Sequence, residues 1–156
     1  MNKLDRRLKV TDYEADYALW CAEQGALLRE GRFDALDREN LAEEIESLER
    51  SERYEIDSRL KVLPVHLLKW RFQPKARSGS WKASIREQRQ PIARLLRDSP
   101  SLKQYPAEIL AAEYELAMPN AADETGLPEE IFPPECPFTI EQVLDQDWLP
   151  EAAGQE

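Results

Sequence analysis

Apolar residues recur every three or four positions over most of the chain, which is the period of an amphipathic helix. The pattern predicts four main helices, over about residues 12–30, 38–72, 81–97 and 101–125. Five glycines in 156 residues are too few for the many tight turns of an all-β fold. We therefore expect an all-α bundle.

Residues that favour helix ends set the predicted boundaries. Thr11 followed by Glu14 matches a capping box, in which each side chain satisfies an amide at a helix start. Asp37 and Ser80 are the predicted N-caps of the second and third helices. Two glycines follow the predicted last turns of the first and fourth helices, where a left-handed residue commonly ends a helix: Gly31 and Gly126.

The second predicted helix is unusually long. Thirty-five residues would span about 52 Å, whereas a compact domain of this size has a radius of gyration of about 15 Å. We expect a break near Ser51 or a kink at Pro64, unless the molecule is elongated. The last turns of this helix are apolar in nearly every direction, which predicts a central, buried position.

The C-terminal part, about residues 127–150, has a different character. Four prolines between positions 128 and 137 predict an extended arm. Thr139 and Gln142 form a second capping-box pattern before a short helix. Four apolar side chains are predicted to pack the arm onto the bundle: Phe132, Phe138, Leu144 and Trp148. We interpret the chain as a single helical domain over residues 1–156, with residues 1–10 as a loose lead.

Charge is distributed in blocks along the chain, whose net charge is −10. Residues 1–33 are neutral, 34–57 carry −7, 58–97 carry +10, and 98–156 carry −13. The overall balance disfavours bulk attraction to nucleic acid or to an anionic membrane. The basic block is a local exception and therefore the main candidate for a site.

Other features restrict the class of protein. No apolar run approaches the roughly 20 residues that span a bilayer, and the N-terminus lacks the apolar core of a secretory signal. Cys21 and Cys136 are far apart and form no C-x-x-C motif. A cytoplasmic protein with reduced thiols and no membrane contact is the simplest interpretation.

Several collinear motifs add a family resemblance. They are "LDRENLAEEIESLERSER", "HLLKW", "SWKASIREQR", "DSPSL", "ETGLP" and "FPPECPFTIEQVL". Together they resemble a bacterial family known as domain of unknown function 29, over roughly residues 12–150. The resemblance implies an all-helical single domain. It implies no catalytic residue, cofactor or substrate.

The acidic block, Glu39 to Glu55, is one candidate for chemistry. Glutamates at three-residue spacing can hold Mg²⁺ where a second acidic pair faces them from another helix. The basic third helix has only Glu87, and the fourth helix offers Glu113 only beside Tyr114 and Glu115. A solvated face with Arg50 and Arg53 as ion-pair partners is the favoured interpretation, and a divalent-metal hydrolase is the less favoured one.

His66 is the only histidine, and its neighbours in sequence suggest no site. A zinc centre needs three or four ligands, and a di-iron bundle needs two E-x-x-H motifs, which the chain lacks. We expect a histidine at the edge of the core that donates a hydrogen bond to a carbonyl or carboxylate. No catalytic residue, metal ligand or cofactor-binding residue is predicted.

The basic segment over residues 69–97 surrounds Trp70 and Trp81. Cations interleaved with aromatic rings can bind nucleic acid through phosphate contacts and base stacking. Alternatively, the basic helix faces lie against the acidic ones, within the chain or between copies. Seven residues define the candidate surface under either interpretation: Lys69, Arg71, Lys75, Arg77, Lys82, Arg86 and Arg89.

The favoured function is a non-enzymatic module that binds a protein partner or itself. Alternating charge blocks and an arm that crosses a bundle suit both kinds of association. Nucleic-acid or anion binding through residues 69–97 is the alternative, although the net charge disfavours it.

Overall fold

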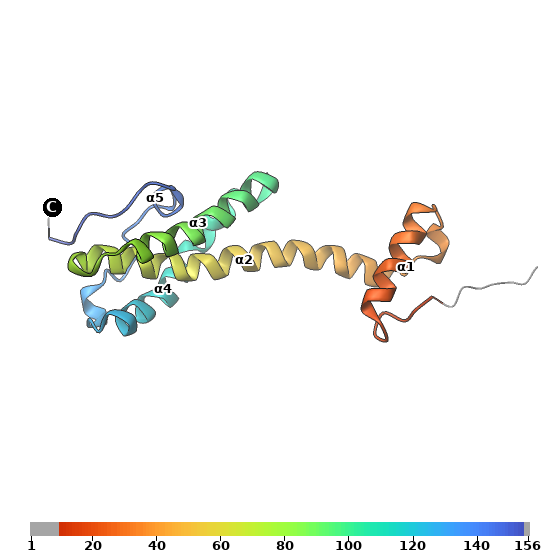
Figure 1. Cartoon of the computed structure of the whole chain (residues 1–156), viewed down its shortest axis with the longest axis horizontal. Helices are drawn as coiled ribbons and strands as arrows, with labels where there is room; N and C mark the ends of the chain where they lie inside the picture. Colours follow the sequence, from red (N-terminus) through yellow and green to blue (C-terminus); the bar gives the residue numbers. More distant parts are fainter. Residues whose placement is uncertain (1–9, 155–156) are drawn as a thin grey trace, which may run out of the picture. The chain divides into compact units, whose positions relative to one another are not determined.

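The computed structural model describes residues 10–154, and every regular element among them is a helix (Figure 1). The α-helices are α1 (Tyr17–Arg29), α2 (Arg38–Phe72), α3 (Gly79–Asp98), α4 (Tyr105–Thr125) and α5 (Ile140–Leu144). Short 3₁₀ turns lie at Phe33–Ala35, Pro74–Ala76, Pro100–Leu102 and Glu129–Ile131. The predicted all-α bundle with four main helices is confirmed.

The chain divides into two compact units, which we call unit 1 (Met1–Glu49) and unit 2 (Arg50–Glu156). Residues of α2 belong to both units. The prediction of one domain over residues 1–156 stays a prediction. The lead predicted over residues 1–10 lies outside the described residues, except for Val10.

In unit 1, α1 begins later than the sequence pattern predicts. Its N-cap is Asp16, whose carboxylate accepts the Leu19 amide at 3.0 Å. The capping box predicted from Thr11 is wrong, because the Thr11 amide and hydroxyl both donate to the Glu23 carboxylate, at 2.7 and 2.8 Å. The Glu14 amide is instead bound by the Asp12 carboxylate, which forms a turn before the helix.

The start of α2 is tied to α1 by side chains around Asp37. The Asp37 carboxylate accepts the backbone N–H of Asn40 at 3.4 Å, which confirms the predicted N-cap. The same carboxylate also accepts the Trp20 indole N–H at 3.1 Å. The Asp37 backbone N–H donates to Gln24 Oε1 at 2.8 Å. Among residues 10–49, three side chains are buried: Trp20, Gln24 and Leu27.

The helix α2 runs for 35 residues through Ser51 and Pro64, so the break predicted near Ser51 is wrong. Glu49 and Arg50 precede Ser51, and Glu52 and Arg53 follow it. These residues are strong helix formers and carry the helix past the serine. Pro64 removes one ladder bond, but its neighbours Leu63 and Val65 are buried in the core and hold the helix in place. A kink at Pro64 stays a prediction.

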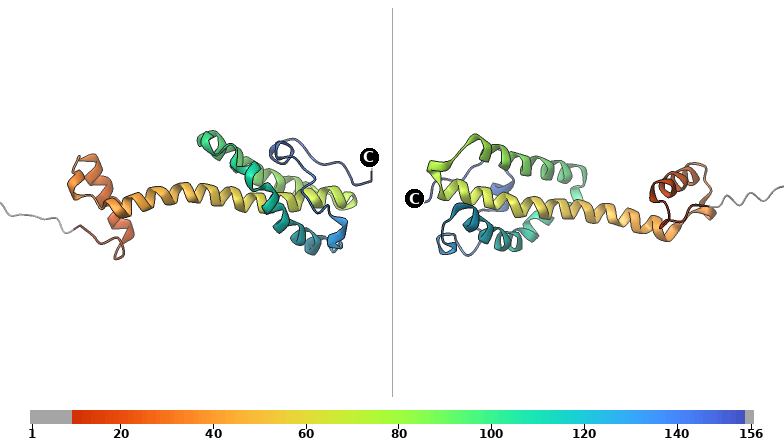
Figure 2. Two further views of the ribbon diagram at one scale, coloured as in Figure 1. Left: turned by 180° about the vertical axis from the view of Figure 1, so that it is seen from behind. Right: turned by 60° about the horizontal axis from the view of Figure 1, so that its bottom comes forward.

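The core of unit 2 surrounds the C-terminal half of α2. Figure 2 shows α3 and α4 running beside this part of α2. Ile85 and Ile92 from α3 and Tyr114 and Ala117 from α4 join a buried cluster with residues of α2: Ile56, Leu60, Leu63, Val65, Leu67 and Leu68. The predicted central position of this helix end is confirmed, with Val62 exposed as the exception.

The ends of α3 and α4 differ slightly from the predictions. Ser78, not Ser80, caps α3, because its hydroxyl accepts the Trp81 amide at 3.3 Å. The predicted fourth helix is split into the 3₁₀ turn at Pro100–Leu102 and α4. Gly31 and Gly126 both have φ near 70°, as predicted for residues that follow a last helical turn.

The C-terminal arm packs on unit 2 as predicted. The capping box of Thr139 and Gln142 is present at the start of α5. Phe132 and Phe138 are buried, and Leu144 and Trp148 pack partly buried against the same core. The Tyr114 hydroxyl also donates to the Pro133 carbonyl at 2.6 Å, so one hydrogen bond from α4 fixes the extended stretch.

Candidate functional site

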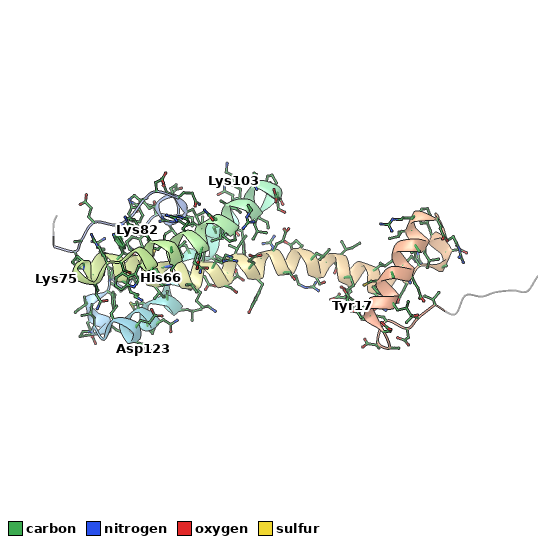
Figure 3. The ribbon with its side chains drawn as sticks, viewed as in Figure 1. Tyr17, His66, Lys75, Lys82, Lys103 and Asp123 are labelled. Carbon is green, nitrogen blue, oxygen red and sulfur yellow. The ribbon has the colours of Figure 1, made fainter. Side chains whose placement is uncertain are left out.

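The predicted basic surface does not form one exposed face. Arg89 is 1% exposed, and Lys69, Arg71 and Arg77 are half-buried. Three of the seven side chains are exposed: Lys75, Lys82 and Arg86. Figure 3 shows Lys75 near the turn between α2 and α3, and Lys82 further along, on α3.

Arg89 holds the C-terminal arm by its backbone. Its guanidinium donates to the carbonyls of Val143 at 2.8 Å, Trp148 at 2.8 Å and Gln142 at 3.2 Å. Two of these carbonyls belong to α5, whose C-terminal end favours a positive charge. Burial lowers the pKa of Arg89, while Asp145 and Asp147 oppose the shift. This basic side chain therefore serves the chain's own arm.

The tryptophans of the basic segment are covered by cations of the same chain. The Arg77 guanidinium carbon lies 4.9 Å from the Trp70 ring centroid, and Lys82 Nζ lies 5.6 Å from it. Lys69 Nζ lies 4.8 Å from the Trp81 ring centroid. Cation–π contacts of this kind occupy the ring faces on which a base would stack. The cations and aromatic rings of this segment thus form cation–π contacts with one another within the chain.

Acidic residues also meet part of the basic segment. Lys69 forms an ion pair with Glu124 at 2.9 Å. Lys82 and Arg86 line a small cleft of about 190 Å³ together with Asp147 of the arm. The acidic partner of Lys69 thus comes from α4, and the acid that lines the cleft comes from the C-terminal arm. The cleft therefore has mixed charge, which weakens its attraction for an anion.

The acidic face of α2 provides no metal cluster. Glu55 pairs with Arg59 at 3.0 Å, and Glu52 accepts the Ser99 hydroxyl at 2.9 Å. Across residues 10–154, no three His, Cys, Asp or Glu side chains are grouped so that they could hold a metal ion. This geometry gives the metal-hydrolase alternative no support.

His66 lies at a cleft of about 200 Å³ between α2 and α4, which Lys61 and Asp123 also line (Figure 3). Its Nδ1 is buried without a hydrogen-bond partner, so this nitrogen does not make the expected donation to a carbonyl or carboxylate. The nearby carboxylate of Glu124 is instead bound by Lys69. Burial and the Lys69 charge lower the pKa of His66, which favours a neutral imidazole.

A groove in unit 1 is an apolar, exposed feature that the sequence did not predict. We call it the unit 1 groove. It has a volume of about 260 Å³ and lies between α1 and the first turns of α2. Its lining residues are Tyr17, Trp20, Cys21, Gln24, Gly25, Leu28, Leu41, Glu44, Ile45 and Leu48. Ile45 is 66% exposed and Leu48 is 68% exposed, so a large part of this lining contacts solvent.

Two polar side chains that line the unit 1 groove, Glu44 and Gln24, are held by hydrogen bonds. Glu44 accepts hydrogen bonds from the hydroxyls of Tyr13 and Tyr17, the second at 2.8 Å. These bonds lower the pKa of Glu44 and raise that of Tyr13 to about 12. Gln24 is only 1% exposed, and its Oε1 accepts the backbone N–H of Asp37, but its Nε2 has no hydrogen-bond partner. The groove thus contains a buried donor that the chain itself does not satisfy.

The sequence does not reveal this groove, because its apolar residues have the same helical spacing as residues of a buried core. Leu41, Ile45 and Leu48 continue the pattern that leads into the real core of unit 2. The available signal was Glu52, which interrupts the stripe between the groove and the residues that are buried. The interrupted stripe separates two apolar surfaces, and the described residues cover only one of them.

Comparison with known proteins gives one match. The model of a family described as "Domain of unknown function DUF29" matches residues 13–149. No curated protein and no solved structure matches the chain. Within the described residues, no helix is both long enough and apolar enough to cross a membrane.

Proposed function

The chain belongs to the DUF29 family, and from this premise we propose that it is a non-enzymatic module of the cytoplasm that binds a protein partner or a second copy of itself. The observation that supports the proposal is the uneven exposure of apolar side chains. Eleven large hydrophobic residues are exposed in the described part of the chain, and seven of them lie in unit 1. Four of the seven line the unit 1 groove: Tyr17, Leu28, Ile45 and Leu48. A contiguous apolar surface commonly marks a protein-binding site.

The poor core of unit 1 supports the same proposal. In its described part, residues 10–49, the buried apolar side chains are Trp20 and Leu27, whereas the main core cluster lies entirely in unit 2. Short helices are marginal in water unless an apolar face is buried. A bound protein would cover Ile45 and Leu48 and complete a core that the described chain leaves open. Binding of a partner would therefore stabilise unit 1 more than unit 2.

Nucleic-acid binding is less well supported by the contacts of the basic segment. Arg89 is used by the arm, and the rings of Trp70 and Trp81 are covered by lysine and arginine side chains. The exposed cations Lys82 and Arg86 share their cleft with Asp147. These contacts leave little of the segment for phosphates or bases.

Affinity capture with the tagged full chain tests the proposed function. A double variant, Ile45→Glu with Leu48→Glu, places charges in the unit 1 groove. The control Leu116→Glu makes the same kind of change at a residue of α4 that is 53% exposed. Circular dichroism checks that both variants retain their helices.

We expect one identified protein to remain bound in a fixed ratio to the wild type and to Leu116→Glu after nuclease treatment. The groove variant should lose it. Sedimentation velocity of the pure chain examines self-association in parallel. The proposal is wrong if nuclease removes every partner and the chain sediments as a monomer.

A further inference from the structure

The unit 1 groove lies in a strongly acidic surrounding. Residues 10–49 contain twelve acidic and three basic side chains, a net charge of −9. On α2, Glu46 and Glu49 directly follow Ile45 and Leu48, so each acid lies about 100° further round the helix than the apolar residue before it. All four of these side chains are exposed. An apolar strip thus runs beside an acidic strip on the same helix.

The shape of the groove suits a helix. Its two walls are α1 and the beginning of α2, and the gap between two helices accepts the apolar ridge of a third. The wall on α1 includes Gly25, where an added Cβ would have no atom within 4 Å. This open wall leaves space for a close approach. The groove follows α1, which at 13 residues is about 20 Å long.

The buried amide of Gln24 is a second, independent indication that something binds here. Its side chain is 1% exposed and lines the groove, and its Nε2 has no hydrogen-bond partner. An unsatisfied buried donor costs free energy, and an acceptor supplied by a partner would remove that cost. The occupant should therefore carry a polar acceptor among its apolar residues.

From these observations we infer that the unit 1 groove binds a basic amphipathic helix of another protein, with lysine or arginine beside its apolar stripe. This inference rests on the proposed function and specifies the partner. The apolar stripe would cover Ile45 and Leu48, and its basic edge would lie along Glu46 and Glu49. Helix-in-groove recognition of this type uses apolar anchors at positions i, i+3, i+4 and i+7.

A second copy of the chain is a poorer occupant of the same groove. Pairing two unit 1 surfaces face to face would bring together two regions that each carry −9 over residues 10–49. Like charges across an interface oppose association. Opposite charges increase both the rate of encounter and the specificity. The charge of the groove therefore favours a basic partner over self-pairing.

Defined peptides test the inference with the full-length chain. The probe is a fluorescent helical peptide of about 18 residues, with leucines at i, i+3, i+4 and i+7, lysines at its other positions and one central serine. One control peptide replaces every lysine with glutamate. Another has the same composition as the probe but a scrambled order without a stripe. Fluorescence anisotropy measures binding at low and high salt.

The lysine peptide should bind at least about tenfold more tightly than either control. Its affinity should fall at high salt, because screening weakens contacts between exposed charges. The double variant Ile45→Glu with Leu48→Glu should abolish binding, while Leu116→Glu should bind like the wild type. Glu46→Gln and Glu49→Gln should each weaken binding about two- to fivefold. Glu108→Gln removes an equal charge from α4 and should leave the affinity unchanged.

Other outcomes separate this inference from the proposed function. If the two charged peptides bind equally, or the groove variant retains the lysine peptide, the inference is wrong. A native protein that is captured through the groove but lacks a basic amphipathic helix would overturn the inference and leave the proposed function standing. Self-association that the groove variant abolishes would likewise overturn the inference and leave the proposed function standing. If the wild type binds neither peptides nor proteins and stays monomeric, both proposals fail.

Discussion

The Arg89 guanidinium in α3 donates its Nε–H to the backbone carbonyl of Val143, 2.8 Å away and 54 residues later in the chain. Both residues are buried, and the same guanidinium also binds carbonyls of Gln142 and Trp148. One planar cation with several donors thus matches carbonyls from two parts of the arm. This contact explains how an extended, proline-rich segment is fixed on a helical bundle.

Arg89→Met should destabilise unit 2 and release the arm. The substitution keeps much of the apolar stem but leaves three carbonyls without their donor. Hydrogen bonds to a charged group each contribute about 1.5–3 kcal/mol and are not additive, so we expect a loss of about 3 kcal/mol. Urea unfolding measures the loss, and limited proteolysis should cleave the arm earlier than in the wild type.

Arg86→Met is the matched control for this experiment. Arg86 lies on the same helix but is exposed. Surface substitutions of this kind usually change stability by less than about 0.5 kcal/mol. Equal effects at the two positions would contradict the anchoring role of Arg89.

The helical period of the apolar residues was sufficient to predict α1 to α4 and the burial of the arm. It could not predict which apolar residues find a neighbour. Leu48 and Leu60 belong to the same series of helically spaced apolar positions in α2, yet Leu48 is exposed and Leu60 is completely buried. The difference arises from α3 and α4, which pack around Leu60 in unit 2. Tertiary contacts of this kind leave no mark in the period.

The charge blocks along the sequence do not show which groups the basic side chains contact in the folded chain. The sequence suggested that basic and acidic helix faces meet, yet the most buried cation, Arg89, binds backbone carbonyls. Carbonyls have no signature in the sequence because every residue carries one. Likewise, Arg77 covers the ring of Trp70, which only the turn between α2 and α3 makes feasible. For these reasons the seven predicted basic residues do not share one exposed surface.

Asp37 makes the stability of unit 1 dependent on acid pH. Hydrogen bonds from Asn40 and Trp20 lower the pKa of this carboxyl, and burial opposes the shift. A group whose pKa is lower in the folded state stabilises folding above its unfolded pKa, and this contribution is lost as pH falls through the folded pKa. The helicity of unit 1 should decrease below about pH 4, the ordinary range of Asp.

Asp37→Asn tests this dependence. The variant keeps a capping side chain but cannot titrate, so it should be less stable at neutral pH and show a smaller loss between about pH 5 and pH 3. Thermal unfolding followed by circular dichroism at several pH values measures both effects. Asp34→Asn is the control, because no hydrogen bond fixes the side chain of Asp34 in the structure. An unchanged pH profile for Asp37→Asn would show that other carboxyls dominate.

His66 predicts a second pH dependence, at higher pH. Burial first, and then Lys69, lower the pKa of His66 from its ordinary value of 6.5. The unfolded chain therefore binds a proton more readily than the folded one. The stabilising contribution is complete above pH 6.5 and declines as pH falls through the folded pKa. His66→Gln should remove this decline, which urea unfolding at pH 7.5 and pH 5.5 would detect.

The charge of Glu124 raises the pKa of His66 and so opposes the lowering by burial and Lys69. Glu124→Gln removes that charge and should lower the pKa of His66 further. Titration of the single imidazole by NMR gives this value directly. A pKa at or above 6.5 in the wild type would contradict the burial of Nδ1 that the structure shows.

Two glycines of unit 1 should respond in opposite ways to the same substitution. Gly25 lies inside α1, and an added methyl group would meet nothing within 4 Å. Gly25→Ala should therefore stabilise the helix by about 0.5–1 kcal/mol. Gly31 has φ near 70°, where a Cβ is strained, so Gly31→Ala should destabilise unit 1 by about 1 kcal/mol.

Helical content and thermal unfolding of both variants measure these changes. Because Gly25 also lines the unit 1 groove, its new methyl group would occupy space that a docked helix uses. Gly25→Ala should then raise the stability of the chain and weaken its binding of the lysine peptide, whereas Gly31→Ala should not alter the groove lining. A Gly25→Ala chain that is more stable and binds equally well would show that the docked helix does not approach α1 closely. Binding would then depend mainly on Ile45 and Leu48 of α2.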